Sequence, residues 1–261
     1  MPDTAFDAFA AAAVLTMARQ GRMARPLDLP AGLRPRDAAQ AYAVQDAVVR
    51  ERGEVAGWKV GAASPVAPPA RAALTRDSVW VGEGEPPAVR LAAADFAVVG
   101  VEAELVYELG ADLPPRDTPY RPEEVLAAVV SVRAAIEVCD TRFAAWAQQG
   151  EWSRLADQAC HGALVVGCGS ADVAGVRPLQ QPVCLWVNGE AAVRHAAGSN
   201  PAGDPLRLLV WLANSGAASL GGLRAGQWVT TGSCTGTVLV APGAQVVADF
   251  AGLGSAVLRV D

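Results

Sequence analysis

The hydrophobic pattern changes its period part-way along the chain, and the change leaves few architectures open. Residues 5–20 and 37–52 carry apolar side chains at helical spacing. From residue 96 onward, short runs of β-forming residues predominate and are separated by glycine and proline. We therefore predict an α+β fold with a β-rich core, in a single domain over residues 1–261 whose first part (1–55) is helical.

Turn and cap residues indicate where several elements begin and end. The dipeptide Asn188-Gly189 is a strong signal for a type I′ β-hairpin. Asp204 followed by Pro205 is typical of the first turn of a helix. The predicted strands are 98–109, 134–138, 164–166, 183–187 and 191–194, with three short strands after residue 226, and the predicted irregular connections are 64–70 and 82–87.

Composition and charge exclude several classes of protein. The formal net charge of −6 argues against a nucleic-acid partner, which requires a basic face. The sequence has no run of 18 apolar residues that could cross a membrane, and Asp3 and Asp7 lie where a signal peptide would be positively charged. We expect a soluble, cytoplasmic protein with no nucleic-acid and no membrane partner. The five cysteines show no CxxC spacing, so a disulfide framework or a zinc site is not expected.

Lys59 is the only lysine among 21 basic residues, and the other 20 are arginine. A coding preference for arginine would explain the twenty but not the one that remains. Lysine differs from arginine where a compact ammonium, or one that can lose its proton, is required. Because Lys59 lies in the apolar, glycine-flanked segment 57–61, we predict a catalytic or substrate-orienting role rather than a solvated surface position.

Acidic residues recur inside apolar strands of the predicted sheet. Glu102 and Glu104 are two residues apart, so their side chains project from the same face of a strand. Neighbouring carboxylates in an apolar setting repel each other unless a cation lies between them. A hard cation such as Mg²⁺ prefers oxygen ligands. A third ligand is expected from a second apolar strand, which offers Glu137 or Asp140.

Four blocks of the sequence resemble, in order, the 2-keto-4-pentenoate hydratase and 4-oxalocrotonate decarboxylase family of the fumarylacetoacetate hydrolase superfamily. The similarity is collinear over roughly residues 5 to 260. The four blocks are GWKVG at 57–61, VEAE at 101–104, AIEVCDTR at 135–142 and TGSCTG at 231–236.

The resemblance implies a β-rich distorted barrel of the fumarylacetoacetate hydrolase type and a site built around a Mg²⁺ or Mn²⁺ cofactor. It implies a homo-oligomer, a pentamer or a decamer, that acts on a small 2-oxo acid substrate, and it allows a complex with a related pathway enzyme. The site residues that it implies are the metal ligands Glu102, Glu104 and Glu137, the catalytic Lys59 and Asp77, and Ser233 and Thr235 at the substrate end.

One block departs from the family pattern. Near Gln158 and Cys160 the family has asparagine and serine, whereas this chain has a Cys160-His161 pair. We therefore include His161 among the predicted substrate-binding residues. The substitution leaves the identity of the substrate open.

The resemblance implies a hydratase that adds water to 2-hydroxypenta-2,4-dienoate (2-keto-4-pentenoate), an enzyme of aromatic-compound catabolism. A 4-oxalocrotonate (2-oxo-hex-3-enedioate) decarboxylase is the nearest alternative, because the same enolate stabilisation would drive loss of CO₂. A non-catalytic accessory subunit of such a complex is a third. A C–C bond hydrolase is disfavoured, since its histidine–glutamate pair would precede the metal ligands and no histidine precedes His161.

Overall fold

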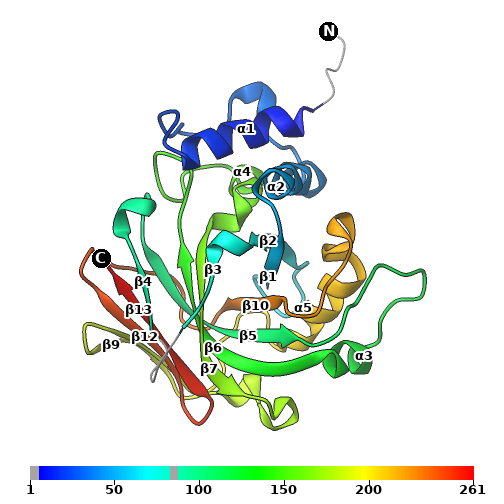
Figure 1. Cartoon of the computed structure of the whole chain (residues 1–261), viewed down its shortest axis with the longest axis vertical. Helices are drawn as coiled ribbons and strands as arrows, with labels where there is room; N and C mark the ends of the chain where they lie inside the picture. The colour runs from blue at the N-terminus through cyan, green and yellow to red at the C-terminus, as the bar shows by residue number, and fades with distance from the viewer. Residues whose placement is uncertain (1–5, 83–87) are drawn as a thin grey trace.

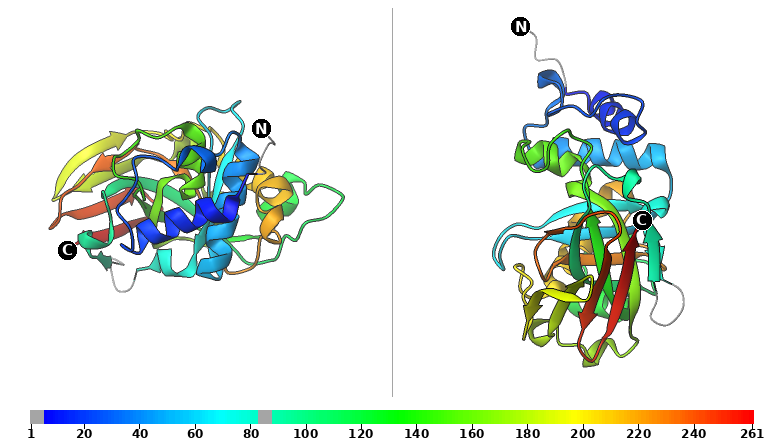
Figure 2. Two further views of the ribbon diagram at one scale, coloured as in Figure 1. Left: turned by 90° about the horizontal axis from the view of Figure 1, so that it is seen from above. Right: turned by 90° about the vertical axis from the view of Figure 1, so that its left-hand side faces the viewer.

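The computed structural model describes residues 6–82 and 88–261, in which two β-sheets are stacked with a group of helices at one end (Figure 1). The larger sheet curls around the site described below. Figure 2 shows the N-terminal helices lying above the ends of the strands rather than on a sheet face. The α-helices of the described residues are α1 (Ala8–Arg19), α2 (Ala38–Arg52), α3 (Pro122–Ala127), α4 (Glu151–Ala156) and α5 (Pro205–Trp211).

The first two helices begin at aspartates and share a small core with α4. The side chain of Asp7 accepts a hydrogen bond from the backbone of Ala10, and that of Asp37 does the same for Gln40. Such caps satisfy amide groups that the first helical turn leaves without partners. The helices then bury apolar side chains against one another and against Phe143, which follows a strand far along the chain. Among the described helices, none is long and apolar enough to span a bilayer.

The larger sheet has the strand order β2-β1-β10-β5-β6-β7-β3, with β11 paired to β5. Its centre is the long antiparallel pair β5 and β6. Both faces of β5 are covered, and even its glutamates at 102 and 104 are at most 9% exposed. The strands are β1 (Val55–Gly61), β2 (Ala70–Thr75), β3 (Val79–Val81), β5 (Gly100–Leu109), β6 (Val129–Cys139), β7 (His161–Ser170), β10 (Trp228–Ser233) and β11 (Val238–Leu239).

The smaller sheet packs against β6 and β7 and closes the main hydrophobic core. Its strand order is β4-β13-β12-β8-β9. The predicted hairpin joins β8 and β9, and both turn residues, Asn188 (φ +52°) and Gly189 (φ +82°), have the positive φ that a type I′ turn requires. The strands are β4 (Ala88–Leu91), β8 (Val183–Val187), β9 (Glu190–His195), β12 (Gln245–Phe250) and β13 (Gly254–Val260).

The predicted distorted barrel and the mixture of helices and strands are confirmed, and several elements need correction. The strand predicted at 134–138 is longer and begins at Val129. Helix α4, strand β4 and strands β2 and β3, which lie mainly between the two predicted connections, were not anticipated, and four strands rather than three follow residue 226. Strand β2 is rich in alanine, a poor β-former, and exists because it pairs with β1. Residues 1–5 and most of the predicted turn at 82–87 lie outside the described residues.

Candidate active site

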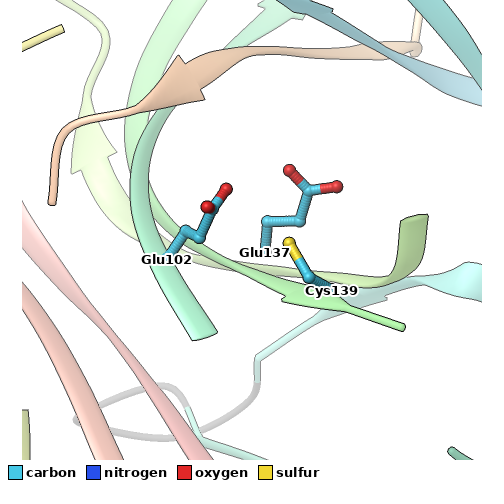
Figure 3. A group of neighbouring side chains, drawn as sticks. All are labelled: Glu102, Glu137 and Cys139. Carbon is cyan, nitrogen blue, oxygen red and sulfur yellow. The ribbon is translucent and has the colours of Figure 1, made fainter. Parts of the chain in front are cut away.

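The register of β5 and β6 brings the predicted acids to one place. Glu102 lies directly opposite Glu137 in the antiparallel pair, and Glu104 lies opposite Ala135. Strand alternation puts all three carboxylates on one face of the sheet, together with Cys139, two residues beyond Glu137. Figure 3 shows the carboxylates of Glu102 and Glu137 projecting toward the same side, with the Cys139 sulfur beside them.

The donor atoms of three of these residues form a compact group. One carboxylate oxygen each from Glu102 and Glu137 and the sulfur of Cys139 all lie within 4.8 Å of one another. Glu104 is not in that group, although its carboxyl group is fully buried. Burial, and then the nearby carboxylates of Glu137 and Glu102, raise the pKa of Glu104 well above its ordinary value. The charge on Glu104 is therefore disfavoured both by burial and by its two acidic neighbours.

The carboxylate of Glu104 is held by one of its oxygens. Oε2 accepts hydrogen bonds from the Thr230 hydroxyl and from the Gly232 amide, the latter at 2.9 Å. Oε1 is buried and has no hydrogen-bond partner. A buried oxygen without a partner is costly, and it is the arrangement expected of a ligand that is held from behind and aimed at an ion.

Glu137 shows the same division between its two oxygens. Oε1 accepts from the Lys59 ammonium at 2.8 Å and lies 3.1 Å from Nδ1 of His161, whereas Oε2 is buried without a partner. Burial raises the pKa of Glu137, and the Lys59 ammonium opposes that shift. For Lys59, burial disfavours the charge, but the carboxylate of Glu137 and the neighbouring acids outweigh it and raise the pKa of the ammonium well above its ordinary value.

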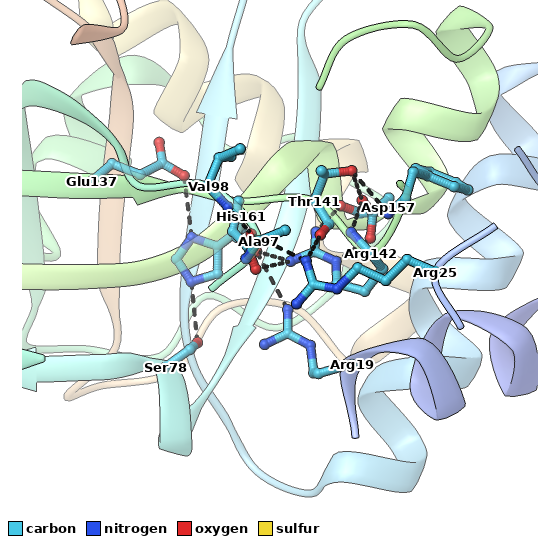
Figure 4. Close-up of polar contacts among 12 residues, drawn as sticks. Arg19, Arg25, Ser78, Ala97, Val98, Glu137, Thr141, Arg142, Asp157 and His161 are labelled. Carbon is cyan, nitrogen blue, oxygen red and sulfur yellow. Dashed lines mark hydrogen bonds and ion pairs between the residues drawn. The ribbon is translucent and has the colours of Figure 1, made fainter. Parts of the chain in front are cut away.

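His161 is a buried link between Glu137 and Ser78, as Figure 4 shows. Its Nε2 lies 3.1 Å from the Ser78 hydroxyl. Burial, together with the nearby Lys59, holds the pKa of the imidazole well below its usual range, so the ring is neutral. Because an ionised carboxylate only accepts hydrogen bonds, Nδ1 donates to Glu137. Nε2 lies within hydrogen-bond distance of the Ser78 hydroxyl, whose single hydrogen also has the Thr75 carbonyl as an acceptor at 2.9 Å. Both ring nitrogens are thus engaged, and His161 orients Glu137.

A left-handed turn, η4 (Gln158–Cys160), forms the wall next to Lys59. All three of its residues have positive φ, between +49° and +63°, although none is glycine. The turn directs the Ala159 carbonyl toward Lys59, whose ammonium donates to it at 3.2 Å. This conformation is costly for residues with a Cβ atom, so the surrounding structure has to maintain it.

A buried ion pair fixes the start of this turn. The Asp157 carboxylate accepts from the guanidinium of Arg142 and from its backbone amide, the latter at 3.0 Å. The same guanidinium donates to the His161 carbonyl at 2.6 Å (Figure 4). Arg142 therefore connects the residue before the turn to the residue after it, and both ends of the turn are anchored to the segment that follows β6.

Of the other predicted site residues, Asp77 lies apart from this cluster, whereas Ser233 lies directly opposite Glu104 in the pairing of β10 with β5. The Asp77 carboxylate is largely exposed and pairs with Arg52 at 2.5 Å, so it does not join the acids. The Ser233 hydroxyl accepts from the amides of its own loop, and the Thr235 hydroxyl accepts from the Ala103 amide at 3.0 Å. Asp140, the alternative third acid, accepts hydrogen bonds from two backbone amides of the segment before β5.

Several residues of the cluster were missed by the sequence reasoning. Cys139 could have been found, because it shares a strand face with Glu137 two positions earlier. Thr230 and Gly232 could not, since they reach Glu104 through the pairing of β10 with β5, across more than 120 residues of sequence. Ser78 reaches His161 in a similar way.

The cluster has the properties of a divalent-metal site. Buried carboxylate oxygens converge from two strands, and two of them lack partners. The opposite oxygens are fixed by hydroxyl, amide, ammonium and imidazole groups, as outer partners fix metal ligands. Oxygen donors of this kind suit hard or borderline divalent ions. The residues present therefore fit such an ion.

Comparisons with known proteins agree with this architecture. Residues 43–261 match the family "Fumarylacetoacetate (FAA) hydrolase C-terminal". The chain is 34% identical to a 2-keto-4-pentenoate hydratase of Paraburkholderia xenovorans over 155 residues, which are 59% of this chain and 56% of that protein. It is 31% identical to a 4-oxalocrotonate decarboxylase of a Pseudomonas species over 185 residues, 70% of this chain and 66% of that protein. The matched segment thus spans little more than half the length of the hydratase.

A solved structure covers almost the whole chain. The 4-oxalocrotonate decarboxylase from Pseudomonas putida G7, complexed with magnesium and adipate, superposes with a TM-score of 0.80 at 24% identity and covers 97% of each chain. At that identity the likeness establishes the fold. Because the family match covers most of the sequence, the chain belongs to the fumarylacetoacetate hydrolase family.

Proposed function

We propose that this chain is a metal-dependent lyase that adds water to 2-hydroxypenta-2,4-dienoate or a close analogue, giving a 4-hydroxy-2-oxo acid. The observation that carries the proposal is the pair of buried, unpartnered oxygens on Glu104 and Glu137, each belonging to a carboxylate whose other oxygen is held. The likeness to hydratases and decarboxylases supports the reaction class.

The proposed ion is Mg²⁺ or Mn²⁺, held by the carboxylates of Glu102, Glu104 and Glu137. The related decarboxylase that was solved with magnesium supports a divalent ion. When bound, such an ion supplies Lewis-acid polarisation of the carboxylate and 2-oxo oxygens of the substrate. The three carboxylates are buried, with Glu102 the most exposed at 9%, so the ion would be largely shielded from bulk water.

Lys59 is the proposed proton carrier. Its ammonium has three N–H groups, of which Oε1 of Glu137 and the Ala159 carbonyl accept two. The third is available to a substrate atom, so Nζ is the proposed site from which a proton is given and to which it returns as dienol and ketone interconvert. His161 is proposed to orient Glu137. Asp77 receives no role, because its carboxylate pairs with Arg52 outside the cluster.

The substrate assay separates the candidate functions. With Mg²⁺ or Mn²⁺ present, a hydratase removes the ultraviolet absorbance of 2-hydroxypenta-2,4-dienoate. A decarboxylase, which the 31% identical relative supports as the second candidate, instead releases CO₂ from 2-oxo-hex-3-enedioate. If neither substrate changes with either ion, both enzymatic proposals fail and the accessory-subunit interpretation is favoured.

A matched pair of variants tests the site itself. Glu104→Gln removes one buried negative charge while its side chain still accepts from Thr230 and Gly232, so we expect activity and ion binding to be lost without loss of fold. Glu108→Gln, on the same strand but paired with Arg133, is the control and should keep both. Turnover retained by Glu104→Gln would refute the site. Activity, ion binding by calorimetry and circular dichroism provide the three measurements.

A further inference from the structure

The sulfur of Cys139 lies beside the carboxylates of the metal site proposed above, and a site of three carboxylate ligands gives this sulfur no role. Cys139 is 4% exposed and forms no disulfide, and its sulfur lies within 4.8 Å of the nearest donor oxygens of both Glu102 and Glu137. A buried cysteine alone is ordinary core material. Here, however, it accompanies a fully buried carboxylate, that of Glu137, whose Oε2 has no partner.

Strand geometry directs this thiol toward the acids rather than away from them. Cys139 lies two residues after Glu137 on β6, so the two side chains share one face of the sheet. The residue opposite Cys139 is Gly100, which places no side chain over the sulfur. A Cβ atom at position 100 would lie 2.6 Å from Thr237, whose hydroxyl donates to Glu102. The glycine thus leaves room for both Thr237 and the thiol.

We propose that Cys139 is a ligand of this metal site beside Glu102 and Glu137, so that the site prefers Fe²⁺, Co²⁺ or Zn²⁺ to Mg²⁺. Thiolate sulfur selects borderline and soft ions, whereas an all-oxygen set suits Mg²⁺. Burial raises the pKa of the Cys139 thiol well above its ordinary value, so the ion would have to displace the thiol proton, which is released to solvent when the ion binds. The proposal rests on the proposed function, because it requires an ion at these carboxylates. A sulfur ligand changes the ion that we expect at this site from Mg²⁺ to one of these transition-metal ions.

Cobalt provides a readout that does not depend on turnover. When Co²⁺ is added to the metal-free protein, coordination by sulfur produces a thiolate-to-cobalt charge-transfer absorption in the near ultraviolet. We expect this band in the wild-type protein and not in Cys139→Ser. The matched control is Cys184→Ser, which removes a buried cysteine from the smaller sheet and should leave the band unchanged.

Competition calorimetry measures the same preference as a ratio of dissociation constants. Cys139→Ser should reduce the preference for Co²⁺ over Mg²⁺ by about tenfold or more, the scale at which groups bordering a metal site alter its affinity. The proposal is overturned if the wild type binds Co²⁺ without the band and Cys139→Ser leaves the ratio unchanged. In that case the carboxylate site of the proposed function still stands.

Two further measurements keep the outcomes distinct. If the wild type binds none of these ions, the proposed function fails and the thiol ligand fails with it. If Cys139→Ser does not fold, Cys139→Ala replaces it, because alanine removes the sulfur without adding a polar group at a buried position. The cobalt band should be absent from Cys139→Ala, and a band that persists in this variant would overturn the proposal.

Discussion

Lys59 is surrounded by groups that fix both its position and its charge. It lies on β1, and its ammonium meets Glu137 at 2.8 Å and the Ala159 carbonyl at 3.2 Å. The acids raise its pKa despite burial, so the chain without a metal ion holds an ammonium at this position at neutral pH. A guanidinium is larger, holds its N–H groups in one plane and does not lose its proton, so it reproduces neither the shape nor the acidity of the ammonium.

We expect Lys59→Arg to keep the fold and to lower turnover by about a hundredfold or more, the scale of a lost proton-transfer group. The charge is retained, so a loss of activity reports on shape and proton transfer rather than on net charge. Steady-state rates with the substrates named above provide the measurement. Arg133→Lys, the reverse exchange at a half-exposed position of β6, is the control and should leave the rate unchanged. A wild-type rate for Lys59→Arg would indicate that the only lysine is a chance survivor.

The sequence identified the chemistry of single residues better than it identified their partners. Glu102, Glu104 and Glu137 could be predicted because their faces follow from strand alternation within two short segments. The role of His161 could not be predicted, since its contacts with Glu137 and Ser78 depend on where β7 begins and on a turn 83 residues earlier. Asp77 was predicted to be catalytic from a loose match in sequence, and its exposed pairing with Arg52 now leaves it outside the cluster.

At the scale of elements, the left-handed turn η4 has no signature in the sequence. Positive φ is normally supplied by glycine or asparagine, but the three residues here are Gln158, Ala159 and Cys160. The tertiary structure imposes the turn through the Asp157–Arg142 ion pair, which joins segments that the local sequence does not relate. Strands β2 and β3 were missed for a similar reason, since their pairing partners β1 and β7 determine their conformation.

The strain of this turn can be measured with one substitution at two positions. Ala159→Gly removes a left-handed cost of about 1 kcal/mol and adds a similar entropic cost in the unfolded chain, so we expect little net change in the free energy of unfolding. Ala13→Gly, at an exposed position inside helix α1, should cost about 1 kcal/mol. Urea denaturation of both variants tests the difference. Equal losses of stability would contradict the strained turn.

At the scale of the whole molecule, the helical N-terminal part is joined to the sheets by buried polar contacts. Arg71 of β2 pairs with Asp46 of α2 at 2.8 Å, and both side chains are buried. The Gln45 side chain also accepts from Arg71, at 3.1 Å. Breaking a buried pair is costly, so the helices should not detach independently. We propose that residues 1–261 unfold as one domain.

The predicted assembly is testable by mass. A pentamer or a decamer should have a mass about five or ten times the 26.8 kDa of one chain. Large apolar side chains remain exposed on the single chain, for example Trp80 at the edge of the larger sheet, and such edge positions suit burial between copies. Analytical ultracentrifugation over a range of protein concentrations provides the measurement. A species of 26.8 kDa at all concentrations would contradict the prediction.

Ion binding and global stability should be coupled through the acids. Without a cation, burial raises the pKa of both Glu104 and Glu137, and the nearby Glu137 raises that of Glu104 further, so ionising these acids costs the folded chain stability. An ion that binds only the folded state adds about 2.7 kcal/mol to the free energy of unfolding when it is present at 100 times its dissociation constant.

We expect urea denaturation midpoints to rise with Mg²⁺ or Mn²⁺ concentration in the wild type and in Glu108→Gln. In Glu104→Gln they should be independent of the ion, and the metal-free variant should be at least as stable as the metal-free wild type, because an amide carries no charge for burial and Glu137 to disfavour. A wild-type midpoint that does not move with either ion would exclude a site that closes around the metal in the folded state.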